Sequence, residues 1–115
     1  MAWGCYILDE QQQPVPEPSL VQWCLWMDQH ADQLQLAIDA VAGVRISTVF
    51  LGMDHGYTPQ QPVLWETMIF GGPLDRQQVR YTSQAEALVG HQEAVWRVRH
   101  HPLGDAARRL RLQPH

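Results

Sequence analysis

Lysine is absent from this chain of 115 residues, so all eight of its basic side chains are arginines. The charges are unevenly distributed: residues 97–115 hold five arginines and one aspartate, a net of +4, whereas residues 1–96 hold three arginines and eleven acids, a net of −8. Affinity for nucleic acids comes mostly from neutralising phosphate charge. An acidic body with a short basic tail therefore makes direct nucleic-acid binding an unfavoured function.

Cysteine and long apolar runs are also scarce. The two cysteines, Cys5 and Cys24, lie in apolar surroundings and form neither a CxxC nor a Cys/His metal motif. No segment approaches the roughly 20 consecutive apolar residues of a membrane span, and the first residues, MAWGCYILDE, lack the basic and apolar regions of a signal peptide. We expect a cytoplasmic protein with two buried thiols and no membrane association, a Cys5–Cys24 disulfide being the alternative.

Hydrophobic residues, by contrast, make up 45% of the chain and include five tryptophans. That content is enough for one compact core in a chain of this length. The sequence therefore predicts a single domain over residues 1–115, of which 102–115 form a short basic C-terminal tail.

The first third of the chain predicts a strand, a loop and a helix. WGCYIL is aromatic and apolar enough for a strand, and the proline-rich segment DEQQQPVPEP predicts an extended loop. Ser19 followed by Gln22 is typical of a capping box at a helix start. Apolar residues then recur at helical spacing. They are Leu20, Trp23, Cys24, Met27, Ala31 and Leu34.

The remainder predicts four strands and a second helix. LAIDAV and VRISTVFLG flank a turn at Ala42 and Gly43, which favours a β-hairpin. PVLWETMIF is apolar on nearly both faces, as in a central strand, and VRYT is short enough for an edge strand. Ser83 and Glu86 indicate a second capping box, with a helix that Pro102 ends. Its predicted inward residues are Ala85, Leu88, Val95 and Trp96, and Gly90 would let it approach the sheet closely.

This order of elements predicts an α+β fold. Consecutive antiparallel strands with helices gathered on one side make a two-layer sandwich. We expect an antiparallel sheet of four to five strands with two helices on one face.

Four residues form the best polar set for chemistry. They are Asp54 and His55 in the loop after the hairpin, Glu66 on the next strand and His91 in the last helix. These residue types suit a divalent metal or a general acid and base, although their spacing matches no HExxH motif. The structural alternative is that Asp54 caps loop amides, His55 bonds a carbonyl, Glu66 pairs with Arg45 or Arg80, and His91 lies at the rim of the helix stripe. No bound cofactor is expected beyond that metal.

A second set of residues suits contact with a partner. Trp26 and His30 flank the apolar stripe of the first helix, whereas Trp23 and Trp96 are expected in the core. Exposed aromatic residues are typical of binding hot spots. The predicted partner-binding residues are Trp26 and His30 together with the loop residues Asp54, His55, Gly56 and Tyr57.

At STVFLGMDH, PVLWETMIFGGP and EALVGH the chain resembles a family of small proteins encoded by bacteriophages and prophages. The resemblance spans about residues 18–99 and is most specific from Ser47 to Gly72. The family carries no established activity, so the resemblance implies a setting: the cytoplasm of a bacterial host cell. Small acidic phage proteins without enzymatic motifs commonly bind a host protein or complex in stoichiometric amounts.

The leading hypothesis is therefore a phage- or prophage-derived accessory protein that binds a host protein, with an anti-defence, anti-CRISPR-like inhibitor as its specific form. It would use its acidic face and the loop from Asp54 to Gln61. The alternatives left open are a small metal- or ligand-dependent enzyme centred on Asp54, His55, Glu66 and His91, and a minor virion component. Self-association as a homodimer is open as well, because a small sheet has an edge strand.

Overall fold

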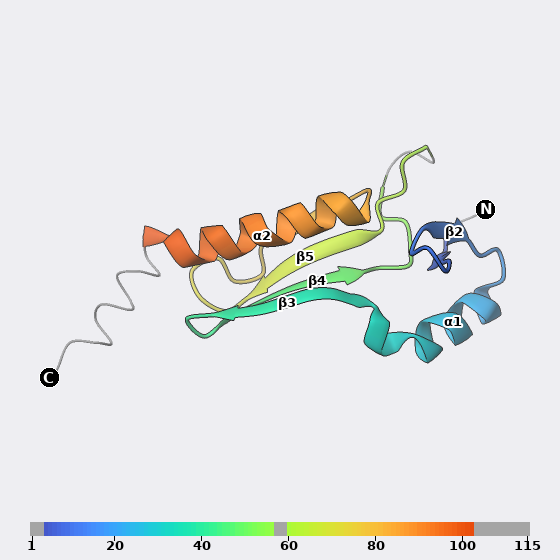
Figure 1. Ribbon diagram of the computed structural model, residues 1–115, viewed down its shortest axis with the longest axis horizontal. Coiled ribbons are helices and arrows are strands. Elements are labelled where there is room, and N and C mark those ends of the chain that lie inside the picture. The colour runs from blue at the N-terminus through green and yellow to red at the C-terminus, as the bar shows by residue number, and fades with distance from the viewer. Residues whose placement is uncertain (1–3, 57–59, 103–115) are drawn as a thin grey trace, which may run out of the picture.

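The structure, a computed structural model, describes residues 4–56 and 60–102. Its helices and strands are β1 (Tyr6–Leu8), β2 (Pro14–Pro16), α1 (Leu20–Gln29), the 3-10 helix η1 (Ala31–Gln33), β3 (Gln35–Val41), β4 (Val44–Phe50), β5 (Trp65–Phe70), β6 (Gln78–Tyr81) and α2 (Gln84–His100). Helix α2 lies along one face of the main sheet, whereas α1 and the β1–β2 pair lie beyond one end of it (Figure 1). The arginine tail predicted beyond Pro102 falls outside the described residues.

The main sheet has four antiparallel strands in the order β3-β4-β5-β6, and helix α2 packs against it. The predicted α+β class is confirmed, as are the hairpin β3–β4, the central strand β5 and the edge strand β6. Two-residue periodicity sends alternate side chains of a strand to opposite faces. In β4 every second residue from Val44 to Phe50 is buried beneath α2, and the residues between them face away from it.

Helix α2 turns a different face to the sheet from the one that the sequence predicted. Of the expected inward residues only Val95 is buried, whereas Leu88 and Trp96 are exposed. The buried residues are instead Ala87, Gly90, His91, Ala94, Val95 and Val98. Most of these side chains are small, and small residues let a helix lie close to a sheet. A methyl group on Gly90 would overlap the Tyr81 side chain, so the predicted close approach occurs at that glycine.

The core has two parts along the sheet. One is aliphatic and lies where Val44, Ile46 and Ile69 meet the C-terminal half of α2. The other is aromatic, and it contains Phe50 and Trp65, whose ring centroids lie 5.4 Å apart. Side chains of α1 and β1 complete this aromatic part from the side, which attaches the N-terminal segment to the sheet.

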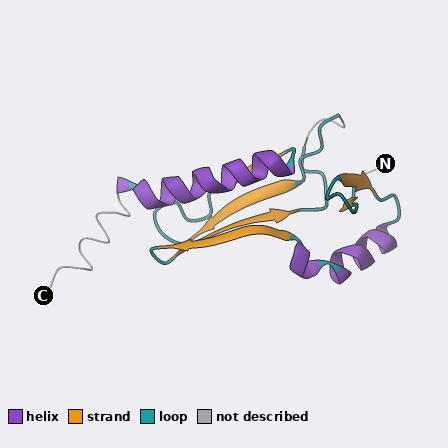
Figure 2. Ribbon diagram, viewed as in Figure 1, coloured by secondary structure: helices purple, strands orange, loops and turns teal. Residues whose placement is uncertain are grey.

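The N-terminal segment differs from expectation in two respects. The prolines do not form only a loop, because Pro14–Pro16 pairs with Tyr6–Leu8 in a separate two-stranded sheet, visible in Figure 2. Proline's extended φ suits an edge strand, where its missing N–H is not needed. In addition, α1 does not share the face of the sheet that α2 covers. It lies against β1, and its Trp26 side chain reaches Phe50 at the end of β4.

Helix α1 also buries less than its stripe predicted. None of its residues is buried, and Leu20 and Cys24 are exposed. Cys5 is only half-buried, and both thiols are free, so the expected pair of buried cysteines is wrong. The predicted caps are confirmed: Ser19 Oγ accepts from Gln22 N, and Ser83 Oγ accepts from Glu86 N. In residues 4–56 and 60–102, no helix has both the length and the apolar character of a membrane span.

Candidate functional site

The four residues predicted to carry chemistry lie in three separate places. Asp54 caps its own loop, because its Oδ1 accepts from Gly56 N at 2.7 Å and from Val63 N at 2.9 Å. His55 is exposed, and its backbone N–H donates to Val63 O. In the described part of the chain no three His, Cys, Asp or Glu side chains are grouped so that they could hold a metal ion. The proposed centre is therefore not assembled from these residues.

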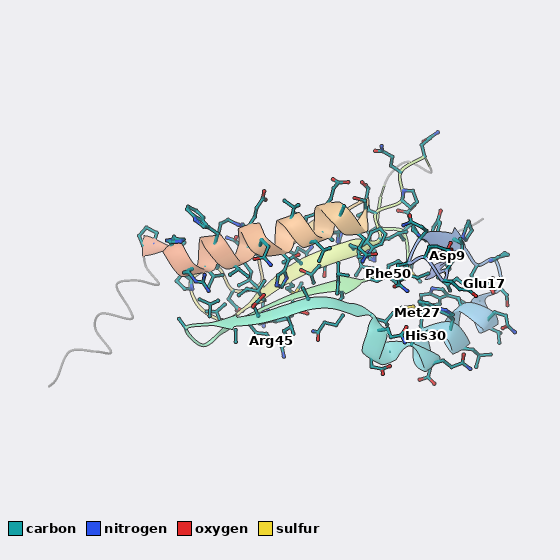
Figure 3. All side chains as sticks on the ribbon, in the orientation of Figure 1. Asp9, Glu17, Met27, His30, Arg45 and Phe50 are labelled. Atoms are coloured by element: carbon teal, nitrogen blue, oxygen red, sulfur yellow. The ribbon has the colours of Figure 1, made fainter. Side chains whose placement is uncertain are left out.

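Glu66 lies on the face of the sheet away from α2. Its Oε2 accepts from Arg80 Nε at 2.9 Å, which is the cross-strand pair that the sequence offered as the structural alternative. Arg45 lies on the same face, as Figure 3 shows, with its guanidinium 4.5 Å from the centre of the Phe70 ring. Exposed ion pairs and cation–π contacts of this kind contribute modestly to stability. They give Glu66 a structural partner.

His91 is fully buried between α2 and the sheet, and not at the rim of the helix as expected. Its Nε2 lies 2.7 Å from Asp39 Oδ2, and its Nδ1 lies 2.7 Å from Thr48 Oγ1. Thr48 Oγ1 in turn lies 2.5 Å from Thr67 Oγ1. The result is a continuous hydrogen-bonded chain of four side chains from three strands and one helix.

For an imidazole that carries a single proton, the chemistry of each group gives the direction of these hydrogen bonds. A carboxylate only accepts, so Nε2 of His91 carries a proton and donates it to Asp39. With Nδ1 unprotonated, the Thr48 hydroxyl donates to it and accepts from Thr67. Every buried polar atom of the three inner side chains is then satisfied.

The same set resembles a hydroxyl, imidazole and carboxylate arranged for nucleophilic catalysis. Access to the hydroxyl decides against that use. Thr48 and Thr67 are buried at 0% and 1% exposure, so neither oxygen can reach a substrate. Asp39 alone is open to solvent, with 49% of its side chain exposed. The arrangement holds α2 on the sheet and is not an active site in this conformation.

Trp26 and His30, predicted to bind a partner, do lie together. Their rings stack with centroids 4.4 Å apart, and His30 Nδ1 donates to the Trp26 carbonyl at 2.8 Å. Both line a hollow of about 560 Å³ between α1 and the turn after β1, where Asp9 and Glu10 also lie. Figure 3 shows His30 and Asp9 at the same end of the molecule. Because the edge of Trp26 also packs against Phe50, it is partly a core residue.

Helix α2 carries an exposed apolar feature that includes two residues, Leu88 and Trp96, which the sequence assigned to the core. Leu88, Val89 and Trp96 are 43%, 60% and 62% exposed and project from the side of α2 that faces away from the sheet. We refer to them as the α2 outer stripe. With Gln92 and Glu93 they line a shallow hollow of about 560 Å³, here named the Trp96 hollow.

Three residues of the buried chain, Asp39, Thr48 and Thr67, were missed by the sequence reasoning. A signal was present for two of them. Thr48 lies on the buried face of β4 with Phe50, and Thr67 lies on the buried face of β5 with Ile69. The two threonines pair across the strands, so each places a hydroxyl among apolar residues at the same position along the sheet. Paired hydroxyls within apolar stripes indicate a polar side chain that reaches them from the covering layer.

No family model, curated protein or solved structure matches this chain. The resemblance to phage proteins therefore stays a prediction.

Proposed function

We propose that the chain is a phage- or prophage-derived accessory protein that binds a host protein in stoichiometric amounts, with anti-defence inhibition as its specific form. The observation that carries the proposal is the α2 outer stripe. A tryptophan with 62% of its surface exposed, beside an exposed leucine and valine, is a contiguous apolar feature on an otherwise polar helix surface. Such patches mark protein contact sites, and tryptophan is enriched among the residues that dominate binding energy.

Burial of this stripe by a partner would remove apolar surface from water, which stabilises a complex by about 25 cal/mol per Å². Stripe residues lie on a rigid helix of 17 residues, so little conformational entropy is lost when they are covered. The net charge of −8 over residues 1–96 supports the anti-defence form, because an acidic surface competes with phosphate for the basic grooves of nucleic-acid-binding proteins.

The test is recovery of a host protein with a defined stoichiometry. The protein is used as bait in a lysate of a bacterial host, the captured protein is identified by quantitative mass spectrometry, and the reconstituted complex is measured by light scattering and calorimetry. Leu88→Ser should weaken the affinity at least tenfold, which corresponds to about 1.4 kcal/mol. Leu20→Ser is the matched control, because Leu20 is an equally apolar, 61% exposed residue on the other helix.

Equal affinity of the Leu88→Ser variant and the wild type would contradict use of the stripe. Capture of a protein that forms no complex of fixed stoichiometry would contradict the function itself. The loop from Asp54 to Gln61 and the pair Trp26 and His30 stay predicted contact sites, which His55→Ala and His30→Ala would test in the same binding assay.

A further inference from the structure

A second hollow lies beside the Trp96 hollow, between α2 and the edge strand β6. It has a volume of about 410 Å³ and is here named the Tyr81 hollow. Its lining residues are Tyr81, Ala85, Glu86, Val89, Gly90 and Glu93. Val89 and Glu93 line both hollows, so the two form one continuous surface along α2.

Tyr81 contributes an unusual polar atom to this hollow. The residue is only 9% exposed, and its hydroxyl, which is buried, has no hydrogen-bond partner in the described part of the chain. It ends against Gly90, where any side chain on the helix would overlap it. A buried hydroxyl without a partner costs about 1–3 kcal/mol. Because Tyr81 is one of the residues that line the hollow, a group bound there could supply the partner that this hydroxyl lacks.

The charges around the hollow are of one sign. Glu86 precedes Gly90 by one helical turn and Glu93 follows it by one, so the two carboxylates lie on the same flank of α2. Oε1 of Glu86 already accepts from the hydroxyls of Thr82 and Ser83. Glu93, in contrast, is exposed and makes no hydrogen bond or ion pair within the described residues.

The nearest basic residue of the helix does not neutralise Glu93. Arg97 lies one turn further on and donates through Nη1 to Gln77 Oε1 at 3.4 Å. Residues 84–96 of α2 contain two acids and no arginine. The hollow thus combines a free carboxylate, an unsatisfied hydroxyl and the apolar side chains of Ala85 and Val89.

We propose that the Tyr81 hollow receives a lysine or arginine side chain of the bound host protein. Its aliphatic stem would pack on Val89 and Ala85, its charge would be balanced by Glu93, and one of its N–H groups would donate to Tyr81 Oη. A long side chain is needed because the hydroxyl is buried against Gly90, one of the residues that line the hollow. This inference rests on the proposed function and specifies the partner's contact segment: an apolar residue over Leu88 and Trp96, followed by a basic residue.

The first test uses n-butylguanidinium as a probe and needs no host protein. Titration followed by amide chemical shifts should give saturable changes at Val89, Gly90 and Glu93, and n-butanol should give none that saturate. Glu93→Gln should weaken the binding of the probe about fivefold, the effect of losing one exposed charge-assisted hydrogen bond. Asp28→Asn removes the same charge from an exposed position of α1 that lines neither this hollow nor the one beside His30, and should leave the affinity unchanged.

Tyr81→Phe separates the hydroxyl from the charge. It removes an atom that has no partner, so the variant should fold with unchanged or slightly higher stability. It should weaken the binding of the probe about twofold to threefold. Equal binding by the wild type and Glu93→Gln, or equal shifts with butanol, would overturn the inference.

The host complex provides the second test and distinguishes this inference from the proposed function. Glu93→Gln should weaken the affinity for the captured host protein about fivefold or more, with a reduced dependence on salt. If the host protein binds both forms equally, the inference fails and the proposed function stands. If no host protein binds while the probe behaves as expected, the proposed function fails and the cation preference of the hollow stands.

Discussion

His91 Nε2 donates to Asp39 Oδ2 at 2.7 Å and so ties helix α2 to the outermost strand of the sheet, across 52 residues of chain. On its other side the ring meets Thr48, which meets Thr67. A buried imidazole is costly unless both nitrogens are satisfied, so this position accepts α2 in one register only. The hydrogen bonds therefore fix the position of α2 on the sheet. Apolar packing of small residues such as Ala87 and Ala94 would fix that position less precisely.

The order of the hydrogen bonds predicts unequal effects of two similar substitutions. Thr48→Val leaves His91 Nδ1 without a partner in a fully buried site, and should lower the free energy of unfolding by about 1–3 kcal/mol. Thr67→Val removes only the last donor of the chain, because Thr48 can still donate to His91. It should cost about 0.5–1 kcal/mol.

Both variants replace a hydroxyl by a methyl group in a strand, so chemical unfolding compares them directly. Unfolding in urea with a common m-value gives the two differences. An equal cost at both positions would contradict the inferred direction of the hydrogen bonds. Their double variant should cost about as much as Thr48→Val alone, because the loss of Thr48 already breaks the contact with Thr67.

At Gly90 we expect alanine to destabilise the protein, although alanine normally stabilises a helix relative to glycine. Replacement of glycine by alanine inside a helix normally stabilises by about 1 kcal/mol. At this position the added methyl group would overlap the hydroxyl and ring of Tyr81. Gly90→Ala should therefore lower the free energy of unfolding by about 1–3 kcal/mol, the range for an overpacked core.

The partner residue supplies the control for Gly90→Ala. Tyr81→Phe should not rescue it, because ring carbons of Tyr81 lie in the same space as the hydroxyl. Tyr81→Leu should rescue part of the loss, which thermal or urea unfolding of the double variant would show. Stabilisation by Gly90→Ala in the wild-type background would mean that α2 can lift from β6 at little cost.

The sequence predicted the sheet well because strands with one buried face record that burial at every second residue. From Val44 to Phe50 the buried and less buried positions alternate as expected. The helix caps were equally predictable, because a serine three residues before a glutamine or glutamate caps a helix through a local contact that does not depend on distant residues. Ser19 and Ser83 both cap as predicted.

The face of α2 could not be predicted from hydrophobicity alone. Leu88 and Trp96 are the most apolar candidates, yet the sheet is covered by smaller residues such as Ala87 and Ala94. The fit between helix and sheet depends on the space left by Tyr81, which belongs to another element. The same long-range dependence hid the pairing of His91 with Asp39, because no local spacing relates a helix residue to a strand residue so far along the chain.

Trp65 and Trp96 differ most in exposure, and we expect their replacement by alanine to have a large and a small effect on stability, respectively. Trp65 is 2% exposed, and Trp65→Ala should cost about 3–5 kcal/mol through lost burial and a cavity. Trp96 is exposed, and Trp96→Ala should change the free energy of unfolding by no more than about 0.5 kcal/mol. Calorimetric melting of both variants measures these values. A large loss of stability in Trp96→Ala would show that the outer stripe is part of the fold and not a contact surface.

We expect loss of Asp54 or of Asp9 to open only the turn that the residue caps. Each carboxylate accepts hydrogen bonds from two backbone N–H groups of its own turn. Asp54 Oδ1 accepts from Gly56 N and Val63 N, and Asp9 Oδ1 accepts from Gln11 N and Gln13 N. Asp54→Ala should cost about 1–2 kcal/mol, and Asp9→Ala less, because its turn is exposed.

Hydrogen exchange would resolve the two openings by residue. Asp54→Ala should speed exchange at Gly56 and Val63 only, and Asp9→Ala at Gln11 and Gln13 only. The same pair then tests the loop as a contact site: if it binds the host protein, Asp54→Ala should weaken the complex while Asp9→Ala does not. Unchanged affinity in Asp54→Ala, with exchange at Gly56 raised, would exclude the ordered loop from the interface and leave the α2 outer stripe and the pair Trp26 and His30 as the candidate contact surfaces.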